Sequence, residues 1–305
     1  MTESLQVRRL ASALGAEVRG LSLARAGEAE AAIVSDLIHE HMVLFFPDQH
    51  LSVDEHVAFG RHFGPLEPHP NVRNAYLEHP YIFELAATKG GIADEWHSDI
   101  TFQAEPSVFA ILNMLRCPEV GGDTMWANAA AAYENLSAPL REMCDGLSAL
   151  HDADPHNRSD QTCIHPVVRV HPVTGRRSLF VNEHFTRRIV ELSHEESAML
   201  LGYLTRWISS PRFTVRYRWQ PGTIAMWDNR CTQHFVLNDF EGERIIQRVT
   251  VMGDKPEAAV PSRWPPFRRA VGAGATSRLD RQLNRHLKAE RPALDDLARA
   301  QGETA

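Results

Sequence analysis

The chain has 305 residues, 43% of them hydrophobic, which allows one large buried core, and its 18 prolines and 18 glycines favour a turn-rich β architecture. Its formal net charge of −7, with acidic and basic residues mixed along the chain, argues against the basic footprint of a nucleic-acid-binding protein. The apolar runs are too short to cross a membrane, the N-terminus does not resemble a signal peptide, and the four cysteines are scattered, so we expect a reduced cytoplasmic protein.

The first elements are predicted from apolar spacing and capping signals. The S-x-x-E pattern at Ser52 is a capping box, and Gly64 follows the last turn of the helix that it begins. A proline-rich loop, residues 65–74, comes next and carries His69. Before this helix we expect a strand and turn at Leu14–Leu23, a helix at Glu28–His41 and a buried strand at Met42–Phe46.

Short strand-like runs, separated by glycine and proline turns, dominate the rest of the chain and favour a β-sandwich or barrel over βαβ units. These runs are Tyr81–Leu85, Val108–Leu115, Thr124–Ala127, Val167–Val170, Ser178–Val181, Phe213–Trp219, Thr223–Trp227 and Arg248–Gly253.

Three further segments have a different character. Asn128–Leu150 has a helical pattern with a break at Pro139. The polar stretch His151–His165 is predicted to be a mobile surface loop, with a lid as one candidate role. A second capping box begins a helix at Ser193–Ile208, so the acidic residues after His194 are expected to cap that helix.

The C-terminal segment differs from the residues before it in composition. Residues 257–305 are rich in proline, glycine and alternating charge, with possible amphipathic helices at Ser277–Ala289 and Pro292–Ala300. We therefore expect a domain at residues 1–256 and a partly helical extension at residues 257–305.

Two motifs carry candidate chemistry. His97 and Asp99 form an H-x-D, which on an extended strand places an imidazole and a carboxylate on one side, as two of the three ligands of an iron ion require. His234 precedes Arg244 and Arg248, and a strand from residue 245 to 252 would place both arginines on one face, where they could hold two anions or one anion at two points.

These residues, together with Thr124 in the run GGDTMW, form an ordered set. With this set the sequence resembles the Fe(II)- and 2-oxoglutarate-dependent dioxygenases of the TauD/TfdA family over roughly residues 7–256. The runs WHSDITF, HPVVRVHPVTGRRSLFVNEHFTRRIV and RWQPGTIAMWDNRCTQH look especially similar to the taurine dioxygenase and alkylsulfatase members of that family.

The resemblance implies a fold and a site. The fold is a double-stranded β-helix, or jelly roll, with flanking α-helices. His97, Asp99 and His234 match the iron ligands, a facial triad that leaves open positions for 2-oxoglutarate and O2. Thr124 and Arg244 match the residues that hold the distal carboxylate of 2-oxoglutarate.

The resemblance also implies a substrate pocket. Arg248 matches the arginine that binds the anionic group of the substrate, and His69 matches the histidine that assists it. Three more pocket positions are matched by Ile100, Phe102 and Phe185, and a homo-oligomer, a dimer or a tetramer, is expected.

The function implied is hydroxylation of an sp3 carbon of a small organic anion, with release of succinate and CO2. We favour a sulfonate or sulfate ester over taurine, because Ala93 and Val72 stand where taurine enzymes carry an amide side chain and a tyrosine. The alternatives are a tailoring oxygenase for an amino-acid-derived or aryloxyalkanoate carboxylate, a non-catalytic cupin-like binding protein, and a zinc hydrolase.

Overall fold

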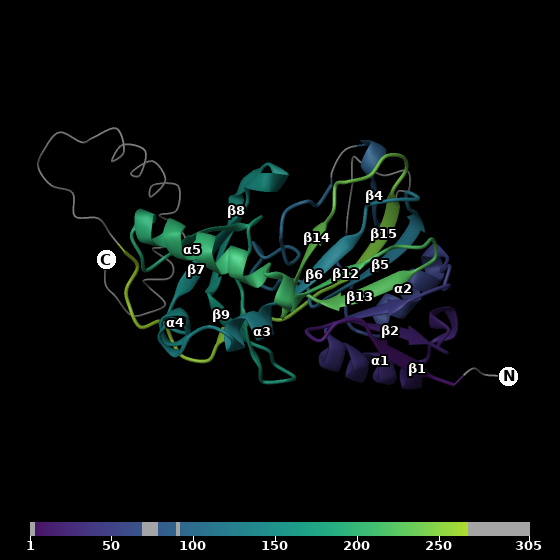
Figure 1. Cartoon of the computed structure of the whole chain (residues 1–305), viewed down its shortest axis with the longest axis horizontal. Coiled ribbons are helices and arrows are strands. Elements are labelled where there is room, and N and C mark those ends of the chain that lie inside the picture. The colour runs from purple at the N-terminus through teal and green to yellow at the C-terminus, as the bar shows by residue number, and fades with distance from the viewer. Residues whose placement is uncertain (1–3, 69–78, 90–91, 268–305) are drawn as a thin grey trace, which may run out of the picture.

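A seven-stranded sheet forms the larger half of a β-sandwich in the computed structural model, which describes residues 4–68, 79–89 and 92–267 (Figure 1). Its strands, in order across the sheet, are β1 (Gln6–Arg9), β2 (Ala16–Arg19), β3 (Val43–Phe46), β13 (Ile224–Asp228), β5 (Phe109–Arg116), β15 (Ile245–Val251) and β4 (Phe83–Ala86). A three-stranded sheet of β12 (Thr214–Tyr217), β6 (Thr124–Asn128) and β14 (Thr232–Val236) packs against it. All pairs are antiparallel except β2 with β3.

Side-chain alternation explains how the large sheet buries both of its faces. Phe45 and Trp227 belong to the apolar cluster between the two sheets, where Phe45 packs edge-on against Trp126 of β6. Their neighbours Leu44 and Met226 point to the opposite face and join a second apolar cluster. This is the double-stranded β-helix that the resemblance implies, and the β-rich fold class is confirmed.

Two helices cover that second face. α1 (Glu28–His41) and α2 (Val53–Arg61) lie below and beside the large sheet in Figure 1. Both predicted helices are confirmed, and Ser52 caps α2 through a reciprocal pair of hydrogen bonds with Glu55. The buried side chains Val34, Ile38 and Val57 join the apolar cluster of this face, so the helices are held by their apolar sides.

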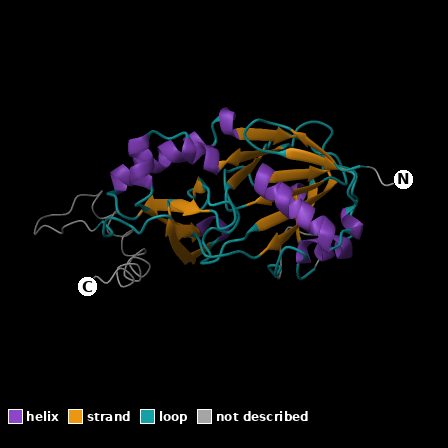
Figure 2. Ribbon diagram, turned by 90° about the horizontal axis from the view of Figure 1, so that it is seen from below, coloured by secondary structure: helices purple, strands orange, loops and turns teal. Residues whose placement is uncertain are grey.

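Smaller sheets and helices form the other end of the molecule, seen at the left in Figures 1 and 2. One sheet has β11 (Thr186–Ile189), β7 (Ser148–Ala153) and β8 (Arg158–Pro166), and another has β10 (Arg177–Leu179), β9 (Val168–Val170) and β16 (Glu257–Ala258). The helices α3 (Ala129–Glu134), α4 (Ala138–Cys144) and α5 (His194–Ile208) complete this end, together with the short 3-10 helices Asp154–His156 and Pro211–Phe213. Two more 3-10 helices, Leu23–Arg25 and Ala87–Lys89, lie elsewhere.

Two sequence predictions in this region are correct only in part. The stretch His151–His165 is not a loop but most of the β7–β8 hairpin. Its tip, residues 154–158 and 160–162, is exposed as predicted, whereas its two terminal histidines are buried. Its polar composition concealed the strands. The polar side chains at the hairpin tip face solvent, and those at its two ends find partners inside the protein, as when His165 Nε2 hydrogen-bonds to the carbonyl of Gln103 at 2.9 Å. Asn128–Leu150 is helical only in part, since Ser148 already begins β7.

Some predictions fall on residues that the structure does not describe. These predictions concern His69, Val72 and the two amphipathic helices expected near the C-terminus, and all of these residues lie outside the described ranges. Glu257–Ala258 pairs with β9, and the division into residues 1–256 and 257–305 stays a prediction.

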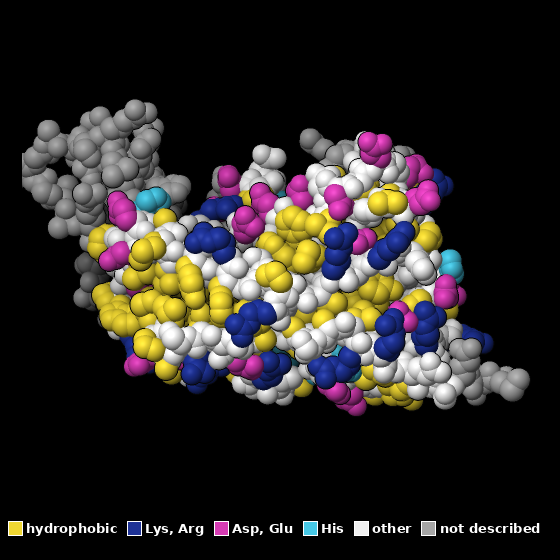
Figure 3. Space-filling view, viewed as in Figure 1, with side chains coloured by type: hydrophobic (Ala, Val, Ile, Leu, Met, Phe, Trp, Pro, Cys, Tyr) yellow, Lys and Arg dark blue, Asp and Glu magenta, His cyan; other side chains and the backbone are white. Residues whose placement is uncertain are grey.

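Within the described ranges, no helix combines the length and the apolar character needed to span a membrane. On the face shown in Figure 3, acidic and basic side chains are interspersed.

Candidate metal centre

A short β-bridge brings together the three residues of the predicted triad. His97 and His234 are cross-strand neighbours that exchange two backbone hydrogen bonds, of 3.1 and 2.8 Å, so their side chains lie on the same side. Asp99 follows two residues later, and its Oδ1 lies 3.9 Å from Nε2 of each histidine. All three side chains are buried, and their donor atoms converge within the spacing that one metal ion spans.

The protonation of the two imidazoles suits a metal. His97 Nδ1 lies 2.7 Å from the carbonyl oxygen of Glu95, and because a carbonyl only accepts, Nδ1 carries the proton. The lone pair of Nε2 then faces Asp99. Burial lowers the pKa of His97 to about 4 and the pKa of His234 well below its ordinary value, so both rings are neutral at pH 7. Two neutral imidazoles and one carboxylate form a donor set that fits Fe(II).

The Asp99 carboxylate is ionised in spite of its burial. Burial is the largest influence and opposes ionisation, but the guanidinium of Arg248 together with the two histidines and the amide of Asn229 outweighs it, and these groups hold the pKa of this carboxyl well below its usual range. Arg248 Nη1 donates to Oδ1 at 2.6 Å, and the side-chain amide of Asn229 donates to Oδ2 at 3.3 Å. The sequence assigned Arg248 to the substrate, whereas here the same guanidinium is also in contact with a triad residue.

An apolar wall stands beside the triad. Ile100, Phe102 and Phe185, all predicted pocket residues, form one buried cluster with Ala153 of β7. The Phe185 ring lies 6.3 Å from the His97 ring. Ile100 has a left-handed backbone, with φ 48°, which is strained for a β-branched residue and turns the chain directly after Asp99.

His184 adds a polar group at the edge of this wall. Its ring is 5.5 Å from that of His97 and 4.5 Å from that of Phe185. Its Nδ1 lies 2.5 Å from Oε2 of Glu95, the residue whose carbonyl fixes the tautomer of His97. The sequence left His184 open as a pocket residue, and the structure places it beside His97 and Phe185.

Arg244 is a buried cation near Thr124. Arg244 Nη2 donates to Thr124 Oγ1 at 3.3 Å, and its Nε donates to the carbonyl of Gly122 at 3.1 Å. Burial lowers the pKa of Arg244 to about 10, which leaves it charged at pH 7. Thr124 Oγ1 also accepts from Trp219 Nε1 at 2.9 Å, so its hydroxyl proton is left to donate to another group.

Arg248 lies four residues further along, on β15. Arg244 immediately precedes that strand, whose pairing with β5 changes register between Ile245 and Ile246, so the shared face of the two arginines stays a prediction. The guanidinium of Arg248 packs over the ring of Phe83, with 4.9 Å from Cζ to the ring centroid. Its buried Nε has no hydrogen-bond partner in the part of the chain that the structure describes, which leaves a donor for an anion.

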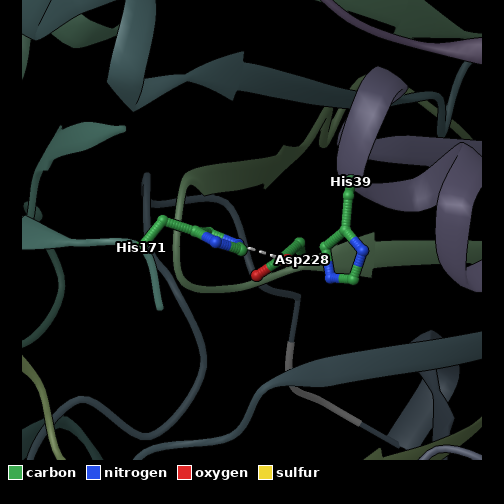
Figure 4. Close-up of side chains that lie close together, drawn as sticks. All are labelled: His39, His171 and Asp228. Carbon is green, nitrogen blue, oxygen red and sulfur yellow. Dashed lines mark hydrogen bonds and ion pairs between the residues drawn. The ribbon is translucent and has the colours of Figure 1, made fainter. Parts of the chain in front are cut away.

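A second cluster of two histidines and an aspartate lies elsewhere in the interior: His39 of α1, His171 and Asp228 (Figure 4). The guanidinium of Arg230 lies among them, with Nη2 2.6 Å from Asp228 Oδ2 and 3.1 Å from His39 Nε2. His171 Nδ1 accepts the backbone N–H groups of residues 173 and 174, so its proton is on Nε2, which donates to Asp228 at 2.9 Å. Both Nε2 atoms are thus committed to hydrogen bonds, and this cluster does not fit a metal.

Comparison with known proteins places this site in a family. A jelly roll that carries a buried His/Asp/His set beside a buried arginine defines the class of 2-oxoglutarate-dependent non-haem iron dioxygenases. Residues 6–250 match the family model described as "Taurine catabolism dioxygenase TauD, TfdA family". The chain belongs to this family, whose members use Fe(II), 2-oxoglutarate and O2.

Similar proteins include an alkylsulfatase of Acinetobacter baylyi, 37% identical over 83% of this chain and 86% of that protein. An alpha-ketoglutarate-dependent sulfate ester dioxygenase of Pseudomonas putida is also 37% identical, over 83% of this chain and 91% of its own length. The crystal structure of a taurine dioxygenase from Burkholderia xenovorans superposes with a TM-score of 0.77, at 37% identity, and covers 84% of this chain and 92% of that one.

Sequence reasoning missed several residues that shape the site. Asn229 contacts Asp99, Trp219 contacts Thr124, and Ala153 completes the apolar wall. Asn229 stands inside the run WDNR, five residues before His234, and that proximity was the one available signal. The other two are distant in sequence from the residues that they contact, and no local pattern indicates such contacts.

Proposed function

We propose that His97, Asp99 and His234 hold Fe(II) in this dioxygenase. Arg244 binds the distal carboxylate of 2-oxoglutarate, and Arg248 binds the anionic group of the substrate. The arrangement of the donor atoms supports the first assignment: one carboxylate oxygen is equidistant, at 3.9 Å, from two neutral imidazole nitrogens.

A single observation carries the cosubstrate assignment. Arg244 is a buried guanidinium that contacts no carboxylate among the described residues, only a carbonyl and the hydroxyl of Thr124. An isolated buried cation is costly, and an anionic ligand would offset that cost. The planar fork of Arg244 and the free hydroxyl proton of Thr124 together suit the two oxygens of one carboxylate.

For the substrate we propose an alkyl sulfate ester or a sulfonate more apolar than taurine. The names of the relatives from Acinetobacter baylyi and Pseudomonas putida support this class. The wall of Ile100, Phe102 and Phe185 is apolar, and Arg248 offers one cationic group at its edge. His69, outside the described residues, is proposed on sequence alone to assist Arg248.

The bound iron and 2-oxoglutarate supply the oxidation of a C–H bond by O2, with release of succinate and CO2. The protein positions the substrate and keeps water away from the reacting carbon. Arg248 fixes the anionic end, so that the carbon beside it faces the triad, and Phe102 and Phe185 exclude water around it. Hydroxylation of the carbon that bears a sulfate ester gives a product that collapses to an aldehyde and hydrogen sulfate.

The test is a substrate panel with Fe(II), 2-oxoglutarate and O2, in which succinate and sulfate are both measured. We expect alkyl sulfates to give succinate and sulfate in equal amounts, and taurine to give little of either. If only aryloxyalkanoates or amino-acid-derived carboxylates couple succinate release to product, the dioxygenase class stands and the sulfate ester proposal fails. If no substrate of the panel gives succinate from 2-oxoglutarate in the presence of Fe(II), the site assignment itself fails.

A further inference from the structure

Asn229 connects the two His/His/Asp clusters: its side-chain amide contacts Asp99 of the first, and it follows Asp228 of the second in the chain. Asn229 is 2% exposed and is the first residue after β13, in the turn that leads to β14 and His234. Its predecessor Asp228 belongs to the cluster of His39 and His171.

All hydrogen-bonding positions of this amide are used, and two of them are on Asp99. Oδ1 accepts the backbone N–H of Asp99 at 3.2 Å and Trp227 Nε1 at 3.1 Å. Nδ2 donates to Asp99 Oδ2 at 3.3 Å and to Ser107 Oγ at 3.1 Å. A backbone N–H and an indole N–H only donate, so the amide cannot be turned round without loss of both bonds.

The two oxygens of Asp99 therefore have different environments. Oδ2 accepts the amide of Asn229 and is not the oxygen that faces the histidines. Oδ1 accepts Nη1 of Arg248 at 2.6 Å, and it also lies 3.9 Å from Nε2 of His97 and from Nε2 of His234, so its remaining lone pair is available to a metal. We propose that Asn229 is a positioning residue that occupies Oδ2, so that Asp99 binds the metal through Oδ1 alone. This proposal rests on the proposed function, which makes Asp99 a metal ligand, and it adds how one oxygen is selected.

The second cluster fixes Asn229 in turn. Asp228 Oδ1 accepts the backbone N–H of Arg230 at 2.9 Å, and its carbonyl accepts the hydroxyl of Thr232 at 2.7 Å, so the turn is closed on both sides. The backbone N–H of Asn229 itself donates to the carbonyl of Val108 at 2.8 Å. These hydrogen bonds fix the backbone of the turn, and the fixed backbone orients the side chain of Asn229 towards Asp99.

The experiment measures metal binding without turnover. Wild type, Asn229→Ala and Asp99→Ala are titrated anaerobically with Co(II), whose d–d absorption weakens as coordination number rises. We expect Asn229→Ala to bind Co(II) about 10- to 100-fold more weakly. We also expect a weaker d–d band per bound ion, because the freed Oδ2 also binds the metal.

Two further variants separate positioning from simple loss of stability. Asn113→Ala removes another buried asparagine, in β5, whose amide donates to the carbonyl of Leu51, and it should keep wild-type Co(II) affinity. Ser107→Ala leaves Asn229 in place but removes one of its partners, and we expect roughly two- to tenfold weaker binding. Ser107→Ala also serves as the test if Asn229→Ala does not fold.

Each result decides the question. A folded Asn229→Ala with wild-type affinity overturns the proposal, and so does weaker binding with an unchanged d–d band, because that pattern indicates a purely structural role. If Asp99→Ala binds Co(II) as tightly as wild type, the proposed iron site fails first and this proposal fails with it.

Discussion

The two clusters of two histidines and one aspartate contain the same residue types and differ in how their ring nitrogens face the carboxylate. At His97, Asp99 and His234 the nitrogens that face the carboxylate lie 3.9 Å from it, and Arg248 contacts that carboxylate with a single nitrogen. At His171 and Asp228 the corresponding distance is a hydrogen bond of 2.9 Å.

The difference originates at the far nitrogen of one ring in each cluster. His97 Nδ1 faces a carbonyl and must donate, which leaves a lone pair on Nε2, whereas His171 Nδ1 accepts two backbone N–H groups, which places the proton on Nε2. At the second cluster the guanidinium of Arg230 supplies the positive charge that a metal would supply. Residue type and distance alone would assign a metal to both clusters, and backbone contacts distinguish them.

The largest expected effect on stability is at the second cluster. Arg230→Ala leaves the carboxylate of Asp228 buried without its cation, and we expect the free energy of unfolding to fall by about 3–5 kcal/mol. Urea denaturation measures it. The matched control is Arg216→Ala, whose guanidinium is 53% exposed and paired with Asp123, with an expected loss below about 1 kcal/mol. Equal losses in the two variants would contradict the comparison.

The two arginines beside the first cluster should affect catalysis more than folding. Arg244→Ala should raise the KM for 2-oxoglutarate, and Arg248→Ala the KM for the substrate, each by roughly 30- to 700-fold for the loss of about 2–4 kcal/mol of charged hydrogen bonding. Steady-state kinetics with each reactant varied in turn measures both. Exchange of the two phenotypes would show that the arginines were assigned to the wrong anions.

The smallest expected effect is on the pH dependence of stability. The pKa of His97 is lowered by burial to about 4, from an ordinary value of 6.5, so between these values the unfolded chain binds the proton more readily. The stabilisation is complete above pH 6.5 and is lost as pH falls towards 4, by about 1 kcal/mol per pH unit. Denaturation of metal-free wild type and His97→Gln should show a shallower slope for the variant. Parallel slopes would mean that His97 is protonated equally in both states.

Much of the fold could be predicted from the sequence, because its signals are local. Capping boxes at Ser52 and Ser193 located α2 and α5, and apolar spacing located α1. The H-x-D spacing placed His97 and Asp99 together correctly. The β7–β8 hairpin was missed because its polar side chains are satisfied by residues distant in sequence, such as Thr101 Oγ1 beside His151 Nδ1 at 3.0 Å.

The properties that separate the two clusters could not be predicted. The tautomer of His171 depends on two backbone N–H groups in the turn that follows it, and the role of Asn229 depends on a contact across 130 residues. The cytoplasmic location and the dimer or tetramer expected from the sequence stay predictions, as does the domain boundary at residue 256.

An anaerobic titration with Fe(II) in the presence of 2-oxoglutarate tests the central claim most directly. We predict one iron per chain, with a charge-transfer band that requires 2-oxoglutarate, and loss of both the iron and the band in Asp99→Ala. Two irons per wild-type chain, or a band that persists in Asp99→Ala, would contradict the assignment of the metal to His97, Asp99 and His234.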